Sequence, residues 1–427
     1  MMRPFVAWVL LAAPIAALPA DPPGKIGGKV TVLGVWGGAE LETFNKLVKP
    51  FQERTGVTVE FEATRDLDAV LTTRVEAGNP PDLALLPSPG KMADLARRGK
   101  LVDLGGVLDM AALKRSYAQG WIDLGTVDGK LVGVFPKADL KGLVWYDPKG
   151  LRASGLSASP GTFDDLLAEA HAAARKGVTP FAIGIESGAA SGWVGTDWLE
   201  NIFLKTYGPA KYRDWYQGKL PWTSPEVKAV WQTWGKIVGD PTLCYGGSPY
   251  ILSTNFGTAF VPLFETPPRA YFHSQATFIQ GFIAKQFPAK KAGDDYSFFA
   301  LPPVDPALAR SAEISGDLVG MFRKTPQAAA FLSYLATAEA QAYWVKGGNG
   351  LSPNRQVSLD DYPSVLSRKA AQILAGAELT VFDASDMMPS KMNTAFWSAV
   401  VSFVSNPSQL DDILAELESV RKTAYPK

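Results

Sequence analysis

The chain has 427 residues, more than one hydrophobic core usually holds, so two domains are expected. Hydrophobic residues make up 47% of the chain and charged residues 20%, a composition typical of a folded protein. The 42 Lys and Arg residues balance 42 Asp and Glu residues. This absence of net charge argues against nucleic acid as a partner.

The first 20 residues have the features of a secretory signal peptide. Arg3 precedes an apolar run, residues 5–18, that is too short to span a bilayer, and cleavage is expected near Ala20. Cys244 is the single cysteine, so no intramolecular disulfide can form and no lipid anchor is expected at the cleavage site. These features predict a soluble periplasmic protein.

Strand-like and helix-like segments alternate from residue 30 to residue 98. Strands are expected over 30–36, 57–61 and 82–86, and a helix follows each of them. This alternation predicts a parallel sheet with right-handed crossovers, in which ligands bind beyond the carboxyl ends of the strands. The three ends carry Trp36 and Glu40, Arg65 and Asp66, and Pro87 and Ser88. Each could be an ordinary polar turn, but three such ends on one rim predict a binding site.

The stretch 181–201 concentrates ligand-binding side chains after a second set of strands. Glu186 ends a short strand, small residues follow, and Trp193 precedes an expected helix in which Asp197 and Glu200 have the spacing of a capping box. Trp198 continues the apolar face of that helix, and its ordinary explanation is burial in the core. Aromatic faces beside carboxylates and free amide groups suit a neutral, hydroxyl-rich ligand such as a sugar.

The remainder of the chain supplies fewer candidate residues. Trp231 and Trp234 have helical spacing and are expected in the core. His273 and Gln275 stand out in the stretch 257–278, but the only other histidine, His171, lies in a helix of ordinary pattern, so a metal site is not expected. Strands are expected near residues 295–302 and 314–323, and the last hundred residues are mostly helical.

Several motifs occur in a characteristic order. They are Phe44, Phe51 and Thr55-Gly56 at a helix end, Gly78-x-Pro-Pro81-Asp82 at a strand entry, the run ending Glu339-Ala-Gln341, and the stretches GVWGGAE, LLPSPGKM, DLKGLVWY, ESGAASGWVGTDWLEN, FHSQATFI and FDASDMMP. Because of these motifs, the chain resembles the periplasmic solute-binding proteins of carbohydrate ABC transporters, the family that includes maltose-binding protein. The resemblance covers nearly the whole mature chain. The more specific stretches resemble members that bind α-glucosides and glucosylglycerol.

The resemblance implies an α/β protein with the two-lobed, type II periplasmic-binding fold. Each lobe would be a mostly parallel sheet flanked by helices, and a hinge would close the lobes on a ligand in the cleft between them. Residues 28–140 and 312–346 would form the N-terminal lobe, and residues 141–311 and 347–427 the C-terminal lobe. The chain would cross between lobes near residues 137–142, 300–314 and 345–352.

The resemblance also indicates individual site residues. Ser88 follows the strand where the first lobe of the family usually meets a sugar hydroxyl, and Glu186 ends a strand whose counterpart in maltose-binding protein carries an acidic sugar contact. Trp397, in Ala-Phe-Trp, matches a tryptophan that stacks on sugar, whereas His273 and Gln275 stand where that protein has another stacking tryptophan. The expected substrate-binding residues are Trp36, Glu40, Asp66, Pro87, Ser88, Lys141, Glu186, Trp193, Asp197, Trp198, His273, Gln275, Asn349, Arg355, Asp386 and Trp397.

The expected ligand is a small neutral α-glucoside, such as trehalose, sucrose, maltose or glucosylglycerol, because carboxylates outnumber Arg65, Lys141 and Arg355 among the candidates. The expected partners are the permease subunits of an ABC importer, and the protein is expected to be a monomer. No catalytic residue, metal or cofactor is expected. Two alternatives remain: a glycan-adhering protein without a transport role, and a glycoside hydrolase that uses two carboxylates from among Glu186, Asp197, Glu200, Asp383 and Asp386.

Overall fold

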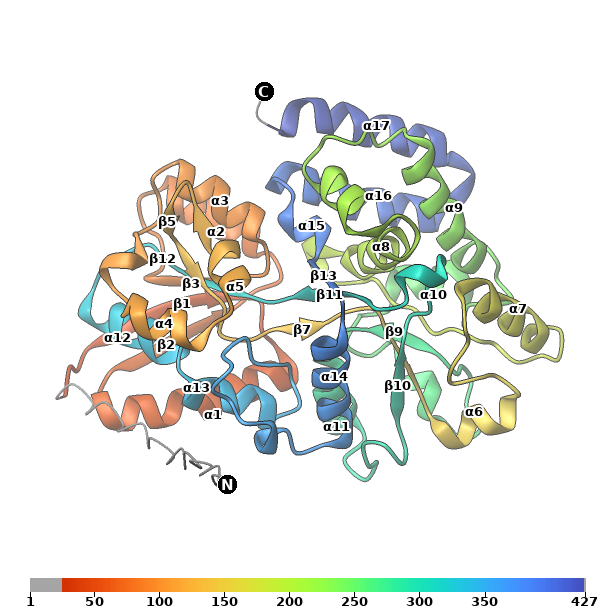
Figure 1. Ribbon diagram of the computed structural model, residues 1–427, viewed down its shortest axis with the longest axis horizontal. Coiled ribbons are helices and arrows are strands. Elements are labelled where there is room, and N and C mark those ends of the chain that lie inside the picture. Colours follow the sequence, from red (N-terminus) through yellow and green to blue (C-terminus); the bar gives the residue numbers. More distant parts are fainter. Residues whose placement is uncertain (1–24, 426–427) are drawn as a thin grey trace, which may run out of the picture.

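The computed structural model describes residues 25–425, so the expected signal peptide lies outside the described residues. Two lobes of strands and helices lie side by side (Figure 1). The first lobe contains β1 (Lys29–Gly34), α1 (Gly38–Thr55), β2 (Thr58–Ala63), α2 (Leu67–Glu76), β3 (Leu83–Leu86), α3 (Pro89–Arg97), α4 (Met110–Ser116), α5 (Gln119–Leu124), β4 (Thr126–Val127), β5 (Lys130–Leu131), β6 (Gly133–Val134), β12 (Leu318–Met321), α12 (Pro326–Leu335) and α13 (Ala338–Lys346).

The sheet of the first lobe has the strand order β2-β1-β3-β12-β6. As expected from the alternation of strands and helices, β1 pairs in parallel with β2 and β3, whereas β12 returns antiparallel to β3 and β6. Adjacent residues of a strand point to opposite faces, so Val32 packs into the core on one face and Leu33 into the core on the other. Helices cover both faces, which explains the continuous apolar strands.

The helix after β1 illustrates how the sequence directs local structure. Phe44, Leu47 and Phe51 lie on one face of α1 and pack against the sheet. The helix ends at Gly56, whose left-handed backbone (φ 69°) caps it with a hydrogen bond to the carbonyl of Gln52. The end of α1 therefore confirms the helix stop expected at Thr55-Gly56.

The second lobe is larger and rich in helices (Figure 1). It contains β8 (Leu143–Tyr146), α6 (Pro148–Ser154), α7 (Phe163–Ala174), α8 (Trp193–Tyr216), α9 (Pro225–Val238), α10 (Gly247–Ser253), β9 (His273–Gln275), α11 (Ile279–Gln286), β10 (Ser297–Ala300), α14 (Val365–Gly376), β13 (Leu379–Phe382), α15 (Ala384–Met387), α16 (Ser390–Ser405) and α17 (Leu410–Ala424). Strand β8 pairs antiparallel with β9 and β10, and isolated parallel bridges join Phe181 to Cys244 and Phe272. Trp231 and Trp234 are fully buried in its core, as expected from their spacing.

Helix α8 starts earlier than the sequence predicted. It begins at Trp193, because Gly192 (φ 109°) turns the chain into the helix, and Gly208 with Pro209 kinks it at the expected stop. Asp197 and Glu200 therefore lie inside the helix and do not form a capping box. Both side chains are free for contacts with other elements.

Two short strands carry the chain between the lobes: β7 (Asp139–Leu140) and β11 (Ser311–Ser315). They pair antiparallel with each other, and β11 also pairs in parallel with β13. Ala138 forms a further bridge with Leu351. The two-lobed α/β class is confirmed, and these segments place residues 137–141 and 315–317 between the lobes. Among residues 25–425, no helix has the length and apolar character that crossing a membrane requires.

Candidate ligand-binding site between the lobes

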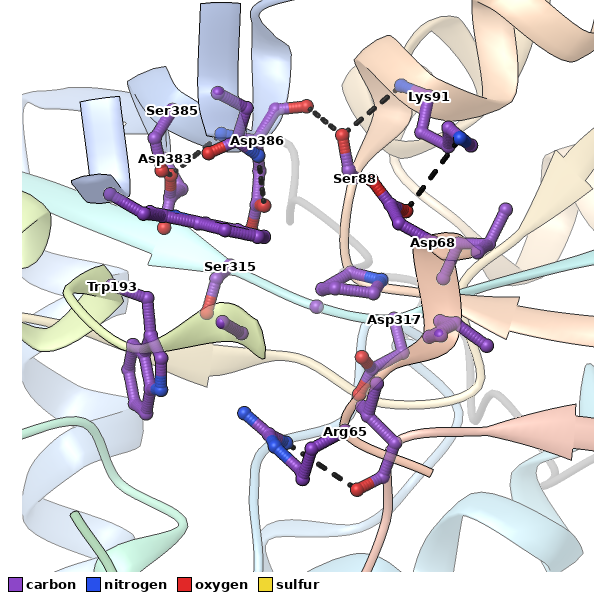
Figure 2. Close-up of a pocket in the computed structure, with 18 of the residues that line it drawn as sticks. Arg65, Asp68, Ser88, Lys91, Trp193, Ser315, Asp317, Asp383, Ser385 and Asp386 are labelled. Carbon is purple, nitrogen blue, oxygen red and sulfur yellow. Dashed lines mark hydrogen bonds and ion pairs between the residues drawn. The ribbon is translucent and has the colours of Figure 1, made fainter. Parts of the chain in front are cut away.

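A cavity of about 310 Å³ lies between the two lobes, and residues of both lobes form its wall. Figure 2 shows Arg65, Asp68 and Ser88 from the first lobe facing Trp193 and Asp386 from the second, with Asp317 of the segment between the lobes. The charged side chains of the wall comprise eight acids and four bases: Glu40, Asp66, Asp68, Asp139, Asp197, Asp317, Asp383, Asp386, Arg65, Lys91, Lys137 and Lys141. Carboxylates therefore outnumber cations two to one.

Lys137 organises the part of the wall next to the first lobe. Its Nζ atom lies 2.5 Å from Glu40 Oε1, 3.1 Å from Asp139 Oδ2 and 3.8 Å from Asp317 Oδ2. Burial by itself lowers the pKa of an ammonium group, but Asp139 and Glu40 raise the pKa of Lys137 above its usual value. Trp36 Nε1 donates a hydrogen bond of 2.7 Å to Asp317 Oδ2. This part of the wall is thus an internally paired, charged network.

Lys141, four residues later, organises the part next to the second lobe. Its Nζ atom donates to Asp197 Oδ1 at 2.7 Å and pairs with Asp383. Burial raises the pKa of Asp197 to about 7, although the nearby positive charge of Lys141 lowers it. Burial, together with the negative charge of Asp383, raises the pKa of Asp386 well above its usual value. Asp197, Glu313 and Asp383 place carboxylate oxygens within 4.8 Å of one another, the spacing of a metal site. Lys141 is already the counter-ion of two of them.

Aromatic side chains form the remaining wall. Trp193 and Trp397 are half-buried, and their indole N–H groups are buried without a hydrogen-bond partner among the described residues. The ring of Trp193 lies 5.2 Å from that of Phe256 between centroids. Trp36 differs, because it is 0% exposed and its ring lies 4.5 Å from the ring of Trp344 in the first-lobe core. Trp193 and Trp397 thus contribute aromatic surface to the wall, whereas Trp36 is mainly a core residue.

Hydrogen bonds close the cavity on one side. Arg65 Nη2 donates to Ser187 Oγ at 2.7 Å, and the amide of Ala189 donates to Asp66 Oδ1 at 3.4 Å. The guanidinium of Arg65 also lies 5.0 Å above the ring of Phe256. Arg65, which the sequence placed at a strand end of the expected rim and offered as a nearby cation, thus joins the first lobe to the second.

Ten of the sixteen expected site residues line the cavity. They are Trp36, Glu40, Asp66, Pro87, Ser88, Lys141, Trp193, Asp197, Asp386 and Trp397. The structure brings them together from strand ends of both lobes. Whether each contacts a ligand stays a prediction.

The other six lie outside this wall, and their own contacts explain why. Trp198 (2% exposed) packs in the second-lobe core, and His273 and Gln275 point into the same lobe from β9, with His273 Nδ1 3.0 Å from the Ala182 carbonyl. Burial lowers the pKa of His273 to about 4, so it is neutral near pH 7.

The last three of these residues stabilise loops through hydrogen bonds. Asn349 donates to Thr43 Oγ1 at 2.6 Å, and Arg355 donates to the carbonyl of Tyr117 at 2.5 Å. Glu186 accepts hydrogen bonds from Asn255 Nδ2 and from the amide of Gly188, which lower its pKa. Glu186 therefore shapes the turn that reaches Arg65.

The structure adds wall residues that the list of expected residues lacked: Arg65, Lys137, Asp139, Phe256, Phe278, Asp317, Asp383, Ser385 and Asn393. The stretches DLKGLVWY and FDASDMMP pointed to some of them. Phe256 and Asp317 carry no local signal, because only the packing of distant segments brings them to the cavity.

Comparisons with known proteins agree with this geometry. The family described as bacterial extracellular solute-binding protein matches residues 37–342. The chain is 38% identical over 408 residues to the osmoprotective compounds-binding protein GgtB of Synechocystis sp., covering 94% of this chain and 96% of the relative. It is 34% identical over 394 residues to the alpha-glucosides-binding periplasmic protein AglE of Rhizobium meliloti, covering 90% and 85%. A solved chitin oligosaccharide binding protein shares the fold, with a TM-score of 0.80, 19% identity and coverage of 93% and 99%.

Proposed function

Because the chain belongs to the family of bacterial extracellular solute-binding proteins, we propose that it is a periplasmic receptor that captures a small neutral α-glucoside and delivers it to the permease of an ABC importer. The observation that carries this proposal is the cavity between the lobes, which is lined by Trp193 and Trp397 and by an excess of carboxylates. The relatives named for osmoprotective compounds and alpha-glucosides support the ligand class.

The charges of the wall favour a neutral ligand. Lys137, Lys141 and Lys91 already lie beside carboxylates, which leaves Arg65, hydrogen-bonded to the neutral Ser187, as the one wall cation without an ion pair among the described residues. A ligand carboxylate or phosphate would therefore meet eight wall acids with only Arg65 to compensate its charge. Hydroxyl groups, in contrast, can donate to carboxylates in strong hydrogen bonds. The wall therefore suits a sugar or a sugar joined to a polyol.

The size of the cavity favours a short ligand. A volume of about 310 Å³ lies at the lower end of the range of roughly 300–1,000 Å³ that is typical of small-molecule sites. One or two rings, as in trehalose, sucrose, maltose or glucosylglycerol, suit this space better than long dextrins.

The proposed receptor binds without catalysis and acts as a monomer. Asp197 and Asp383 are two of the carboxylates that a glycoside hydrolase could use, but both form ion pairs with Lys141. The lobes would be residues 28–140 with 312–346, and 141–311 with 347–427, and β7 and β11 would lie at the hinge. Turnover of aryl α- or β-glucosides by the purified protein would contradict this proposal.

Two measurements test the ligand class. Mass spectrometry should identify a neutral glucoside released from the purified protein by denaturation. A thermal-shift panel should show stabilisation by at least one of the four glucosides, since a ligand at a hundred times its dissociation constant adds about 2.7 kcal/mol to the free energy of unfolding. Stabilisation by glucosylglycerate or sugar phosphates alone would overturn the neutral assignment.

A further inference from the structure

The segment Asp383–Ser390, here called the strap, leaves β13, passes the cavity and enters α16. Asp383, Ser385, Asp386 and Ser390 line the cavity. Within the strap, Asp383 Oδ1 accepts hydrogen bonds from Ser385 Oγ at 2.8 Å and from the amide of Asp386 at 2.9 Å. The strap therefore presents its carboxylates as one preformed unit, drawn at the top of Figure 2.

Glu200 of α8 holds the strap from behind. Its side chain is 0% exposed and does not line the cavity. Glu200 Oε2 accepts a hydrogen bond of 2.9 Å from the amide of Ala384, and Oε1 accepts one of 3.1 Å from the amide of Ser385. Tyr212 accepts a second bond from the Ala384 amide at 2.9 Å. One carboxyl group thus fixes two consecutive amides between Asp383 and Asp386.

The opposite side of the strap docks on the first lobe. Ser88 Oγ donates to the carbonyl of Asp386 at 2.8 Å. Ser390 Oγ donates to Asp68 Oδ2 at 3.0 Å, and its amide donates to Asp94 Oδ2 at 3.2 Å. Asp386 therefore faces the cavity with its carboxyl group and the first lobe with its carbonyl. A displacement of the strap would change both contacts.

We propose that Glu200 is a positioning residue for ligand binding, which sets the strap so that Asp386 meets the ligand and the first lobe together. This inference rests on the proposed function of the cavity as a sugar site. Glu200 acts through the Ala384 and Ser385 amides, since it reaches neither the cavity nor the first lobe. Occupancy of the cavity and closure of the lobes are coupled through this segment.

The test uses Glu200→Gln, which keeps the shape of the side chain but turns one acceptor oxygen into an NH₂ group that cannot accept from a backbone amide. Trehalose, sucrose, maltose and glucosylglycerol are titrated by calorimetry. We expect the affinity for each sugar that binds the wild type to fall roughly tenfold, because one of the two strap amides loses its acceptor oxygen on residue 200. Glu418→Gln is the matched control, because Glu418 is also buried and accepts from the Trp222 amide at 3.0 Å, far from the cavity wall. Its affinities should not change.

A double-mutant cycle with Asp386→Asn separates positioning from general destabilisation. If Glu200 acts through the strap, the double variant should bind sugar less than twofold more weakly than the Asp386→Asn single variant. Full additivity, or an equal loss in the Glu418 control, overturns the inference.

Hydrogen exchange supplies a readout that needs no sugar. The amides of Ala384 and Ser385 should exchange faster in Glu200→Gln than in the wild type. Their exchange rates should not change in Glu418→Gln. Unchanged exchange in Glu200→Gln overturns the positioning role. Failure of all four sugars to bind the wild type overturns the proposed function instead, and with it the part of the inference that concerns the ligand.

Discussion

At the scale of single residues, the tryptophans of the cavity wall fall into two kinds. Trp397 is half-buried, its indole N–H group has no hydrogen-bond partner within residues 25–425, and it lies on α16 at the cavity. Trp36 is fully buried and bonded to Asp317. The same side-chain type should therefore contribute to ligand binding in one place and to folding in the other.

We predict that Trp397→Ala weakens sugar binding by about 2 kcal/mol, roughly thirtyfold, because a buried aromatic contact with the ligand is lost. Trp36→Ala should instead lower the free energy of unfolding by about 3–5 kcal/mol, since it leaves a cavity in the first-lobe core. Calorimetric titration and urea unfolding measure the two effects. Equal sugar affinities of Trp397→Ala and the wild type would contradict the stacking role.

At the scale of secondary-structure elements, the contact between α3 and the strap explains a glycine in a helix. Gly90 lies in the first turn of α3, and a Cβ atom there would overlap the carbonyl oxygen of Met388. Its backbone is ordinary, so alanine would suit the helix itself. The absence of a side chain is thus needed only where the lobes meet.

We predict that Gly90→Ala prevents full closure without destabilising the fold. In small-angle scattering, the wild type with saturating sugar should have a smaller radius of gyration than without it, and Gly90→Ala should keep the larger value. Its affinity should fall at least tenfold. Gly120→Ala is the control, because Gly120 lies in α5 with open space around its Cβ position. Identical closure of the two variants would remove the role assigned to Gly90.

At the scale of the whole molecule, the pH dependence of stability should reflect the acids buried between and behind the lobes. Glu313 is 0% exposed; Asn201 donates to its Oε2 atom at 2.9 Å, while Oε1 has no partner among the described residues. Burial, reinforced by Asp383, raises its pKa well above the usual value. Between the unfolded and folded pKa values the folded state binds more protons, so the contribution of Glu313 to stability declines as pH rises.

We predict that Glu313→Gln loses less stability than the wild type as pH rises above about 4.3, the ordinary pKa of an unfolded glutamate, because the decline begins there when the folded-state pKa is raised. An amide carries no charge to desolvate, and its NH₂ group can donate toward the neighbouring carboxylates. Urea unfolding at several pH values measures the difference. Glu418→Gln should follow the wild-type slope, because Arg421 lowers the pKa of Glu418 and keeps it ionised throughout. Parallel curves for the Glu313 variant and the wild type would contradict the prediction.

The sequence by itself determined the local features of the fold, which depend on residues that are close together along the chain. The apolar face of α1, the stop at Gly56 and the alternation of strands and helices are local patterns. They were enough to predict the parallel strands of the first lobe and the strand ends that carry Trp36 and Ser88. The two-lobed class was implied by the family that the motifs resemble.

Only the tertiary structure decided which of these side chains share the cavity. Trp36 meets Asp317 across 281 positions of sequence, and Ser88 meets Asp386 across 298. Asp197 and Glu200 show the limit of local spacing most clearly. Three residues apart, they fit a helix cap, but Gly192 starts the helix before them. Lys141 instead donates a hydrogen bond to Asp197, and the amides of the strap donate to Glu200. Burial makes such distant partners obligatory, because a charged group removed from water must find a counter-charge or donor wherever the fold supplies one.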